Sequence, residues 1–429
     1  MHIEYPKFTV IIPQKNRAEY IGHTLKTCMI QEYPNFEIIV SDDGSEDDSV
    51  AVIKDLMTKD SRIKLFAHKE HLGMRDNFEF ALNQVDTGYV IALGGDDGLV
   101  PGCIQRMYEI IKETGTELLT WRPAGFLYSE QKGIPSLVMV PRVNKDKIHW
   151  IKSEDFLNKM ASTLWYQSND CPMIYMKGVA SLEIINRVKS RTKDNSFYYC
   201  PTPDGFSGIV LAGEVEKYVY IEEPLSIVGT TTKSQGQNYG RTDEKSRKEA
   251  QEFFNDNIRR TMHRELASQP YSPLITLMTA DYLLTARDLP GWPGRFNCFT
   301  FDFLLKKAFS QISSTPYDDD VLSRELIILR NIAKQHNLLD LYEKLYKETI
   351  RKKPLAKVRH GFAVTHSYRF NGTQLGINNI YDACLAVNFA YRFCNLMSPK
   401  FFLGAFLRTF KIVMDKYKYT KSKLPIIKE

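Results

Sequence analysis

Two adjacent carboxylates, Asp96 and Asp97, follow an apolar run and stand between glycines in the stretch LGGDDGLVPG, residues 93–102. Mg²⁺ and Mn²⁺ bind carboxylate oxygens, and in enzymes they usually share one or two carboxylates with substrate phosphates. Glycines beside such acids give a bulky ligand room to approach the backbone. The pattern indicates a cation site that bridges a diphosphate and stabilises it as a leaving group, although an acidic turn would have the same sequence.

A second acidic cluster, SDDGSEDD at residues 41–48, also follows an apolar run. A carboxylate only accepts hydrogen bonds, so Asp42 or Asp43 would suit the imide N–H of a uracil or thymine base. The alternative is the start of a helix, with Ser45 as its cap and the acids in its first turn. Both interpretations stay open on this evidence.

The segments around these clusters alternate between apolar runs typical of strands and patterns of helical period. Apolar runs without polar alternation indicate strands buried on both faces, and the helices between them indicate right-handed crossovers. This predicts an open α/β sheet, in which ligands bind beyond the carboxyl ends of the strands. The predicted strands lie at 8–13, 36–45, 63–68, 89–95 and 117–122, and the predicted helices at 17–30, 46–57, 76–85 and 103–114.

The pattern changes further along the chain. Residues 123–235 read as mixed α and β structure, and the chain after about residue 240 reads as helical and rich in charge. We therefore expect one domain over residues 1–238 and a helical C-terminal region over residues 239–429. Strands are predicted at 126–131, 136–140, 173–176 and 219–229, and helices at 153–163, 178–189, 243–266, 321–350 and 378–397.

Composition narrows the classes of protein to consider. A net charge of +6 over 429 residues is too small for a dedicated nucleic-acid binder. The seven cysteines include no C-x-x-C pair, which argues against a zinc site and fits a reducing compartment. Neither a signal peptide nor an apolar stretch long enough for a membrane helix is present, so we expect a cytoplasmic protein.

The motifs over residues 7–115 resemble those of the family 2 glycosyltransferases: FTVIIP, IVSDDGS and GYVIALGGDDG occur in the order of that family. The resemblance weakens over residues 120–235 and ends near residue 240. It implies a GT-A type fold, which is an open mixed, Rossmann-like α/β sheet flanked by helices, here followed by the mainly α-helical C-terminal region. It also implies inverting transfer of a sugar from a UDP- or dTDP-linked donor, with Mn²⁺ or Mg²⁺ as cofactor.

The resemblance implies roles for single residues. Asp43 matches the acid that holds the pyrimidine base, Asp97 stands where the metal ligand falls, and Arg75 is similar to an arginine near the diphosphate. Gln14 departs from the family's usual threonine, and Gly95 stands where relatives often have a third acid. The expected nucleotide-sugar-binding residues are Pro13, Gln14, Asn16, Arg17, Asp43, Arg75 and Asp96, and the expected metal ligand is Asp97.

The resemblance also implies a catalytic base about a hundred residues after the metal motif. Inverting transfer needs a carboxylate that takes the proton of the acceptor hydroxyl while its oxygen attacks the anomeric carbon. Asp204, in YYCPTPDGFSGIVLAGE, follows a proline and precedes an apolar run, as at the start of a helix. Asp170 and Glu214 are alternative bases, and a helix cap is the structural alternative for Asp204. Lys233 and Ser234 are expected near the diphosphate.

These observations predict a non-processive glycosyltransferase, because the Gln-x-x-Arg-Trp motif and the membrane helices of processive synthases are missing. The expected acceptor is a glycan or a lipid-linked sugar, in the synthesis of a bacterial surface polysaccharide or glycoconjugate. One alternative is a sugar-phosphate nucleotidyltransferase, but PQKNRAEY lacks the glycine-rich loop of that class. The other alternative is a scaffold with a degenerate transferase domain.

The basic, aromatic segment 399–423 is expected either to lie on an anionic membrane surface, at the inner face of the cell membrane, or to pack as a core helix. Association into a homo-oligomer is a further expectation, and no nucleic-acid partner is expected.

Overall fold

The strands predicted over the first hundred residues form one half of an eight-stranded sheet. The computed structural model describes residues 5–130, 134–142, 147–234, 244–257, 260–314, 317, 319–351 and 367–394. Every residue of the first two strands is buried, as expected for strands without polar alternation. The parallel strands are β1 (Phe8–Gln14), β2 (Phe36–Asp42), β3 (Ile63–Ala67) and β4 (Tyr89–Ala92), and the helices around them are α1 (Ala18–Met29), α2 (Ser49–Met57), α3 (Met74–Asn83) and α4 (Cys103–Thr114).

The other half of this sheet contains both parallel and antiparallel strands. The order of all eight strands in the sheet is β3-β2-β1-β4-β10-β6-β11-β9. The predicted helix at 178–189 is instead a strand followed by a short helix. The first residue of that strand is a glycine, Gly178, and a Cβ there would lie 2.4 Å from the carbonyl oxygen of Met173. These elements are β6 (Leu118–Trp121), β9 (Ile148–Lys152), β10 (Gly178–Ser181), α6 (Leu182–Lys189) and β11 (Lys217–Ile221).

A second sheet of five strands has the order β13-β8-β7-β12-β5. The predicted strand at 219–229 is two strands, one in each sheet, because the chain crosses between the sheets at residues 222–225. The predicted strand at 173–176 is reduced to one bridge between Ala92 and Tyr175. The second sheet contains β5 (Gly98–Leu99), β7 (Ala124–Leu127), β8 (Leu137–Pro141), β12 (Ser226–Thr230) and β13 (Ser367–Asn371).

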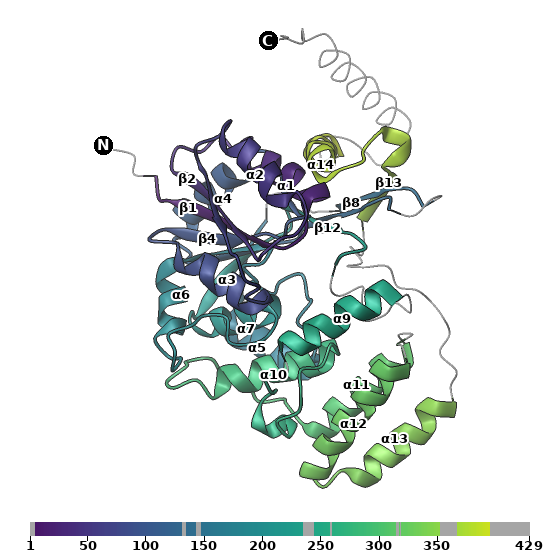
Figure 1. Cartoon of the computed structure of the whole chain (residues 1–429). Helices are drawn as coiled ribbons and strands as arrows, with labels where there is room; N and C mark the ends of the chain where they lie inside the picture. The colour runs from purple at the N-terminus through teal and green to yellow at the C-terminus, as the bar shows by residue number, and fades with distance from the viewer. Residues whose placement is uncertain are drawn as a thin grey trace.

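The expected division at residue 238 does not describe how residues 367–394 pack. Strand β13 pairs antiparallel with β8, and helix α14 (Ile380–Cys394) shares a core with the second sheet. Cys384 and Val387 of this helix are fully buried among residues of that sheet, including Ile227. The late part of the chain therefore returns to the first domain, at the opposite end of the molecule from helices α11 (Phe301–Ser314), α12 (Asp319–Gln335) and α13 (Leu339–Arg351) (Figure 1).

The region between these parts is helical, as predicted. Helix α10 packs against α7 and α5, so the helical region shares the larger core with the first sheet. The predicted helix at 321–350 is two helices, separated near Asn337, whose φ is +58°. The elements are α5 (Ser153–Thr163), α7 (Pro203–Gly213), α9 (Glu244–Asp256), η1 (Arg264–Leu266), α10 (Ile275–Arg287), α11 (Phe301–Ser314), α12 (Asp319–Gln335) and α13 (Leu339–Arg351), with η2 (Thr373–Leu375) before α14.

Among the described helices, none combines the length and the apolar character needed to cross a bilayer. The segment 399–423 lies outside the described residues. The predicted fold class, an open mixed α/β sheet flanked by helices and followed by a mainly helical region, is confirmed.

Candidate active site

The carboxyl ends of β1, β4 and β12 meet at one place. Arg17, which caps α1 after β1, donates through Nη2 to the carbonyl oxygen of Lys233 at 2.9 Å. Lys233, which follows β12, donates through Nζ to the carbonyl oxygen of Asn16 at 2.9 Å. The side chain of Arg17 also packs on the acidic loop, because a Cβ at Gly95 would lie 3.0 Å from its Cγ. Two cationic side chains therefore stand beside the predicted diphosphate site.

The acidic loop after β4 is held rigidly by its neighbours. Thr24 of α1 donates its hydroxyl to the carbonyl oxygens of Gly95 (3.0 Å) and Asp97 (2.8 Å). Tyr128 donates its hydroxyl to the carbonyl oxygen of Asp96 at 3.2 Å. Gly229 of β12 approaches this loop so closely that a Cβ would lie 1.9 Å from the same oxygen. Only glycine allows this approach, which brings the end of β12 against the two acids.

The two adjacent carboxylates have different environments. Asp97 is 1% exposed, and its Oδ1 and Oδ2 accept hydrogen bonds from the backbone N–H groups of Gly229 and Gly94, both at 2.9 Å. Asp96 accepts a hydrogen bond on Oδ2 from the hydroxyl of Thr231, at 3.0 Å. Asp97 therefore joins β4 to β12, whereas Asp96 is bound by a side chain at the end of β12.

Burial and the neighbouring Asp96 raise the pKa of Asp97 to about 7, against the effect of its two backbone donors. Two carboxylates this close together resist ionising together. A cation would relieve that repulsion, and the donors present (the carboxylates and the Thr231 hydroxyl) are the oxygen ligands that Mg²⁺ and Mn²⁺ prefer. The residues present thus fit the expected cation, with Asp96 rather than Asp97 as the carboxylate less occupied by the backbone.

The acids after β2 also have hydrogen-bonding partners within the chain. Asp43 accepts hydrogen bonds from the backbone N–H groups of Leu72 (2.6 Å) and Gly73 (3.2 Å), and its Oδ2 lies 2.8 Å from Nδ1 of His71. The other ring nitrogen of His71 lies 2.9 Å from Asp256 at the end of α9. Sequence reasoning missed His71, which connects the expected base-binding acid to the helical region.

The remaining residues predicted on the nucleotide side lie along β1 and just after it. Pro13 is buried in β1 opposite Ser41, and Gln14 donates through Nε2 to Asp42. Asn16 has a φ of +53°, and its Oδ1 accepts from the N–H of Glu46 at 2.9 Å. Asn16 and Gln14 therefore tie the end of β1 to the acidic turn after β2.

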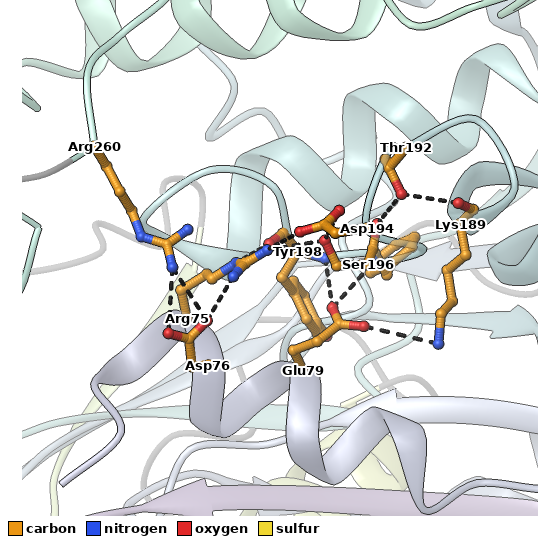
Figure 2. A network of polar contacts seen from close by, with 10 residues as sticks. Arg75, Asp76, Glu79, Lys189, Thr192, Asp194, Ser196, Tyr198 and Arg260 are labelled. Atoms are coloured by element: carbon orange, nitrogen blue, oxygen red, sulfur yellow. Dashed lines mark hydrogen bonds and ion pairs between the residues drawn. The ribbon is translucent and has the colours of Figure 1, made fainter.

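Arg75, expected from the sequence near the diphosphate, hydrogen-bonds to the loop that precedes α7 (Figure 2). Its guanidinium donates to the carbonyl oxygen of Tyr198, to Ser196 Oγ at 2.9 Å, and to the adjacent Asp76 at 2.6 Å. Glu79, one turn along α3, accepts from the N–H groups of Phe197 (2.9 Å) and Tyr198 (2.8 Å). Arg75 and Glu79 therefore form a brace between α3 and residues 196–198.

Asp204 is the second residue of α7, as predicted. Its Oδ2 accepts a hydrogen bond from the hydroxyl of Tyr166 at 2.9 Å. No donor among the described residues meets its buried Oδ1 at hydrogen-bonding geometry. Burial raises the pKa of Asp204 against the opposing effects of the nearby Gly205 N–H and the Tyr166 hydroxyl. A carboxylate with a raised pKa and a free lone pair is suited to accept a proton.

The two alternative bases are less suited to that chemistry because each is paired with a cation. Asp170 lies 2.7 Å from Lys159, and although burial alone would raise its pKa, the hydrogen bond from Lys159 brings it below the usual value. Glu214 accepts two hydrogen bonds from Arg191, at 2.7 and 3.1 Å. The structure favours Asp204 among the three.

Four further residues around the site, besides His71, were not singled out from the sequence. Thr231 contacts Asp96, Tyr175 contributes a hydrogen bond to Asp97, Tyr166 bonds to Asp204, and Tyr282 lies near Asp204. All four lie outside residues 7–115, where the order and spacing of the motifs indicated which residues to assign. The hydroxyl run GTTTKS at residues 229–234, directly after a strand, is the one signal that could have indicated Thr231.

One further group of metal-ligating side chains occurs in the part of the chain that the structure describes. His263, Glu265 and Asp288 lie together near the surface. Asp288 is paired with Arg264 (3.0 Å) and Arg287 (2.8 Å), and Arg287 also binds Glu265. The guanidinium groups already balance these carboxylates, so we assign no cation there.

The larger sheet, with acids at its strand ends, defines a Rossmann-like α/β domain. The family model "Glycosyl transferase family 2" matches residues 9–151 of the chain.

Curated relatives match the same part of the chain. A Campylobacter jejuni protein named GalNAc(5)-diNAcBac-PP-undecaprenol beta-1,3-glucosyltransferase is 34% identical over 109 residues, which are 25% of this chain and 35% of that protein. Glycosyltransferase GlyA of Streptococcus pneumoniae is 31% identical over 124 residues, 29% of this chain and 18% of that protein. The chain thus spans about a third or less of the length of these two relatives.

Solved structures match at low identity. S. aureus TarS 1-349 in complex with UDP is 13% identical, with a TM-score of 0.45, over 90% of this chain and 92% of that one. The mannosyltransferase PcManGT from Pyrobaculum calidifontis, in complex with GDP-Man and Mn²⁺, is 14% identical, with a TM-score of 0.38, over 82% and 89%.

Proposed function

We propose that this chain is an inverting, metal-dependent, non-processive glycosyltransferase that moves a sugar from a UDP- or dTDP-linked donor to a glycan or lipid-linked acceptor. The observation that carries the proposal is Asp204, a buried carboxyl at the start of α7 with a raised pKa and an unoccupied oxygen. The match of residues 9–151 to the family model of glycosyl transferase family 2 supports it.

In this proposal, the ends of β1, β4 and β12 hold the donor. Asp96 with Thr231 would hold Mn²⁺ or Mg²⁺, whose chemistry is to neutralise the diphosphate as it leaves. Arg17 and Lys233 supply further positive charge beside the same loop. Asp97 keeps this arrangement rigid, because it joins the loop to β12.

Asp43 would accept the imide N–H of the base, as the resemblance implies. Its carboxylate already accepts two backbone hydrogen bonds and contacts His71. An oxygen of a carboxylate has two lone pairs, so a base could bind beside these donors or displace the ring of His71.

At the other side of the site, Asp204 would take the proton of the acceptor hydroxyl as that oxygen attacks the anomeric carbon opposite the leaving diphosphate. The proton stays on the Asp204 carboxyl until the acceptor product leaves and solvent removes it.

The Campylobacter relative carries an undecaprenol-linked substrate in its name, which supports a lipid-linked acceptor and a place at the inner face of the cell membrane. We extend the proposal to bacterial surface glycan or glycoconjugate synthesis, with the protein in the cytoplasm and membrane contact through residues 399–423. Co-sedimentation with anionic vesicles tests that contact, and equal binding by a chain that ends at residue 398 would contradict it.

The experiment that tests the proposed reaction begins with thermal melting in the presence of UDP-glucose, UDP-N-acetylglucosamine, dTDP-glucose and GDP-mannose, each with and without Mn²⁺. A donor that binds only the folded chain raises the Tm. With the donor so identified, release of the nucleoside diphosphate is measured against acceptor. Asp204→Asn should keep the Tm shift and lose about 10²- to 10⁴-fold in transfer, the usual contribution of a general base.

Asp170→Asn is the matched control, since it removes a carboxyl of the same region that is paired with a lysine. Full transfer by Asp204→Asn, or loss only in Asp170→Asn, would contradict the assignment. Release of pyrophosphate from a nucleoside triphosphate and a sugar phosphate would instead indicate a nucleotidyltransferase. A chain with no Tm shift for any donor would indicate a scaffold.

A further inference from the structure

The side chain of Tyr166 makes a direct hydrogen bond with Asp204. This residue lies in the segment between α5 and β10, its side chain is 2% exposed, and its hydroxyl donates to Asp204 Oδ2 at 2.9 Å. Its backbone N–H donates to Thr279 Oγ1 of α10 at 3.2 Å. Tyr166 is therefore fixed on one side by the helical region and on the other by the first turn of α7.

The start of α7 is shaped to receive this ring. A Cβ at Gly205 would lie 2.6 Å from the ring of Tyr166 and 2.5 Å from the ring of Tyr282. The two rings pack edge to face, with centroids 5.4 Å apart, and the hydroxyl of Tyr282 contacts Thr202, the cap of α7. Tyr166 therefore binds Asp204 directly, and Tyr282 binds the residue that caps the same helix. The glycine at position 205 leaves room for both rings.

We propose that Tyr166 is a positioning residue that directs one oxygen of the Asp204 carboxylate to the acceptor. The inference depends on the proposed role of Asp204 as catalytic base. With Oδ2 bound to the Tyr166 hydroxyl, Oδ1 is the oxygen left to receive the proton. Carboxylate orientation decides which lone pair faces the acceptor, and a fixed orientation saves reorganisation during the reaction.

The hydroxyl of Tyr166 can act as a permanent donor. Burial, and then the nearby Asp204, raise the pKa of Tyr166 well above its ordinary value, so the phenol stays protonated wherever the carboxylate is ionised. A hydrogen bond to a charged acceptor is stronger than one to its neutral form. The contact therefore opposes the effect of burial and keeps the carboxylate available as a base at a lower pH.

The test is Tyr166→Phe in the full chain. Phenylalanine keeps the ring against Gly205 and removes only the hydroxyl, so packing is retained. We expect the acidic limb of the pH dependence of kcat/KM, which reports the base of the free enzyme, to move up by about one pH unit. The Tm shift produced by the donor with Mn²⁺ should stay unchanged, because the hydroxyl does not reach the donor side.

The matched control is Tyr342→Phe. Tyr342 is a buried tyrosine of α13 whose hydroxyl donates to the carbonyl oxygen of Leu326 at 3.1 Å. The Tyr342→Phe variant should lower the Tm as much as Tyr166→Phe does, and its pH dependence of kcat/KM should be that of the wild type. A Tyr166→Phe profile that falls equally at every pH would overturn the inference and leave a structural role.

A second measurement does not require activity. The pKa of the Asp204 carboxyl is followed by ¹³C NMR of chain labelled at aspartate Cγ, with the signal assigned by its absence in Asp204→Asn. We expect this pKa to rise in Tyr166→Phe and not in Tyr342→Phe, and an unmoved pKa would overturn the inference. Transfer retained by Asp204→Asn is a separate result, which would overturn the catalytic base and the positioning role together.

Discussion

At the scale of the residue, two adjacent acids of identical type have been given different surroundings. Asp97 accepts from two backbone N–H groups and is almost fully buried, and Asp96 contacts the Thr231 hydroxyl at the end of β12. A motif of two acids does not by itself indicate which oxygen atoms are available to a cation. The partners of each carboxylate decide this.

The first prediction separates these roles. Asp97→Asn should lower the free energy of unfolding by about 1–3 kcal/mol, because the amide NH₂ cannot accept and one backbone N–H loses its partner. Asp96→Asn should leave the Tm nearly unchanged and abolish the part of the donor's Tm shift that depends on Mn²⁺. Thermal melting checks both, with Asp55→Asn on the exposed face of α2 as control. A metal-specific loss confined to Asp97→Asn would contradict it.

A second residue-scale prediction concerns Asp281 of α10. It is buried, its Oδ1 accepts from the N–H of His263 at 2.6 Å, and burial raises its pKa to about 7. Because the folded pKa lies above the ordinary value of 3.8, the protonated carboxyl contributes stability that is present below that value and is lost as the pH rises through about 7.

Asp281→Asn keeps an accepting oxygen and cannot ionise. It should therefore stabilise the chain at pH 8 by about 1–3 kcal/mol relative to the wild type, and the difference should vanish near pH 4. Denaturant unfolding at both values of pH measures this, with Asp155→Asn, an exposed site on α5, as control. A variant that is less stable at pH 8 would show that the ionised form is the one the fold requires.

At the scale of the element, helix α3 connects the two halves of the site. It begins directly after His71 and Gly73, which contact Asp43, and through Arg75 and Glu79 it binds residues 196–198. Asp204, at the start of α7, lies six positions after the last of those residues, Tyr198. The helix thus fixes the loop that leads into the proposed base relative to the proposed donor site, through the contacts of Arg75 and Glu79 that Figure 2 shows.

The prediction at this scale is for Arg75→Met. Loss of the brace should lower kcat about ten- to a hundredfold through misplacement of Asp204 while the donor Kd stays within about twofold. Steady-state kinetics and calorimetry of donor binding measure the two quantities. Arg62→Met is the control, since Arg62 also donates to two backbone carbonyls but far along the chain from the loop. A rise in donor Kd with kcat unchanged would instead support the contact between Arg75 and the diphosphate that the sequence predicts.

At the scale of the whole molecule, the chain leaves the first domain near residue 234, forms the helical region, and returns with β13 and α14. Helix α14 contacts α1, β5 and β12, three elements that carry or flank the proposed donor site. A Cβ at Gly98, one residue after Asp97, would lie 2.7 Å from the sulfur of Cys384. The last described helix therefore closes the core under the acidic loop.

The corresponding prediction is that Val387→Asp, at a fully buried position of α14, lowers the free energy of unfolding by about 3–5 kcal/mol. Because the second sheet packs on α14, the Tm shift produced by the donor should weaken as well. Ile327→Asp is the control, at a position of α12 that is 61% exposed, and should change little. Equal stability of the two variants would show that α14 adds nothing to the first domain.

The sequence by itself determined the βαβ half of the larger sheet and the places where ligands meet it. Apolar runs such as residues 8–13 have no polar alternation, so burial on both faces follows from their composition. The acids after β2 and β4, and Asp204 at the start of α7, could be placed because local signals such as strand ends and a proline at the first helical position suffice.

The tertiary structure alone decided the partners of those residues. Asp97 bonds to Gly229, Tyr166 bonds to Asp204, and β13 pairs with β8 more than two hundred positions earlier in the chain. Arg75 turned to residues 196–198 rather than to the acidic loop for the same reason. Local spacing specifies strands, helices and their ends, but which distant backbone groups satisfy a buried charge depends on how the whole chain packs.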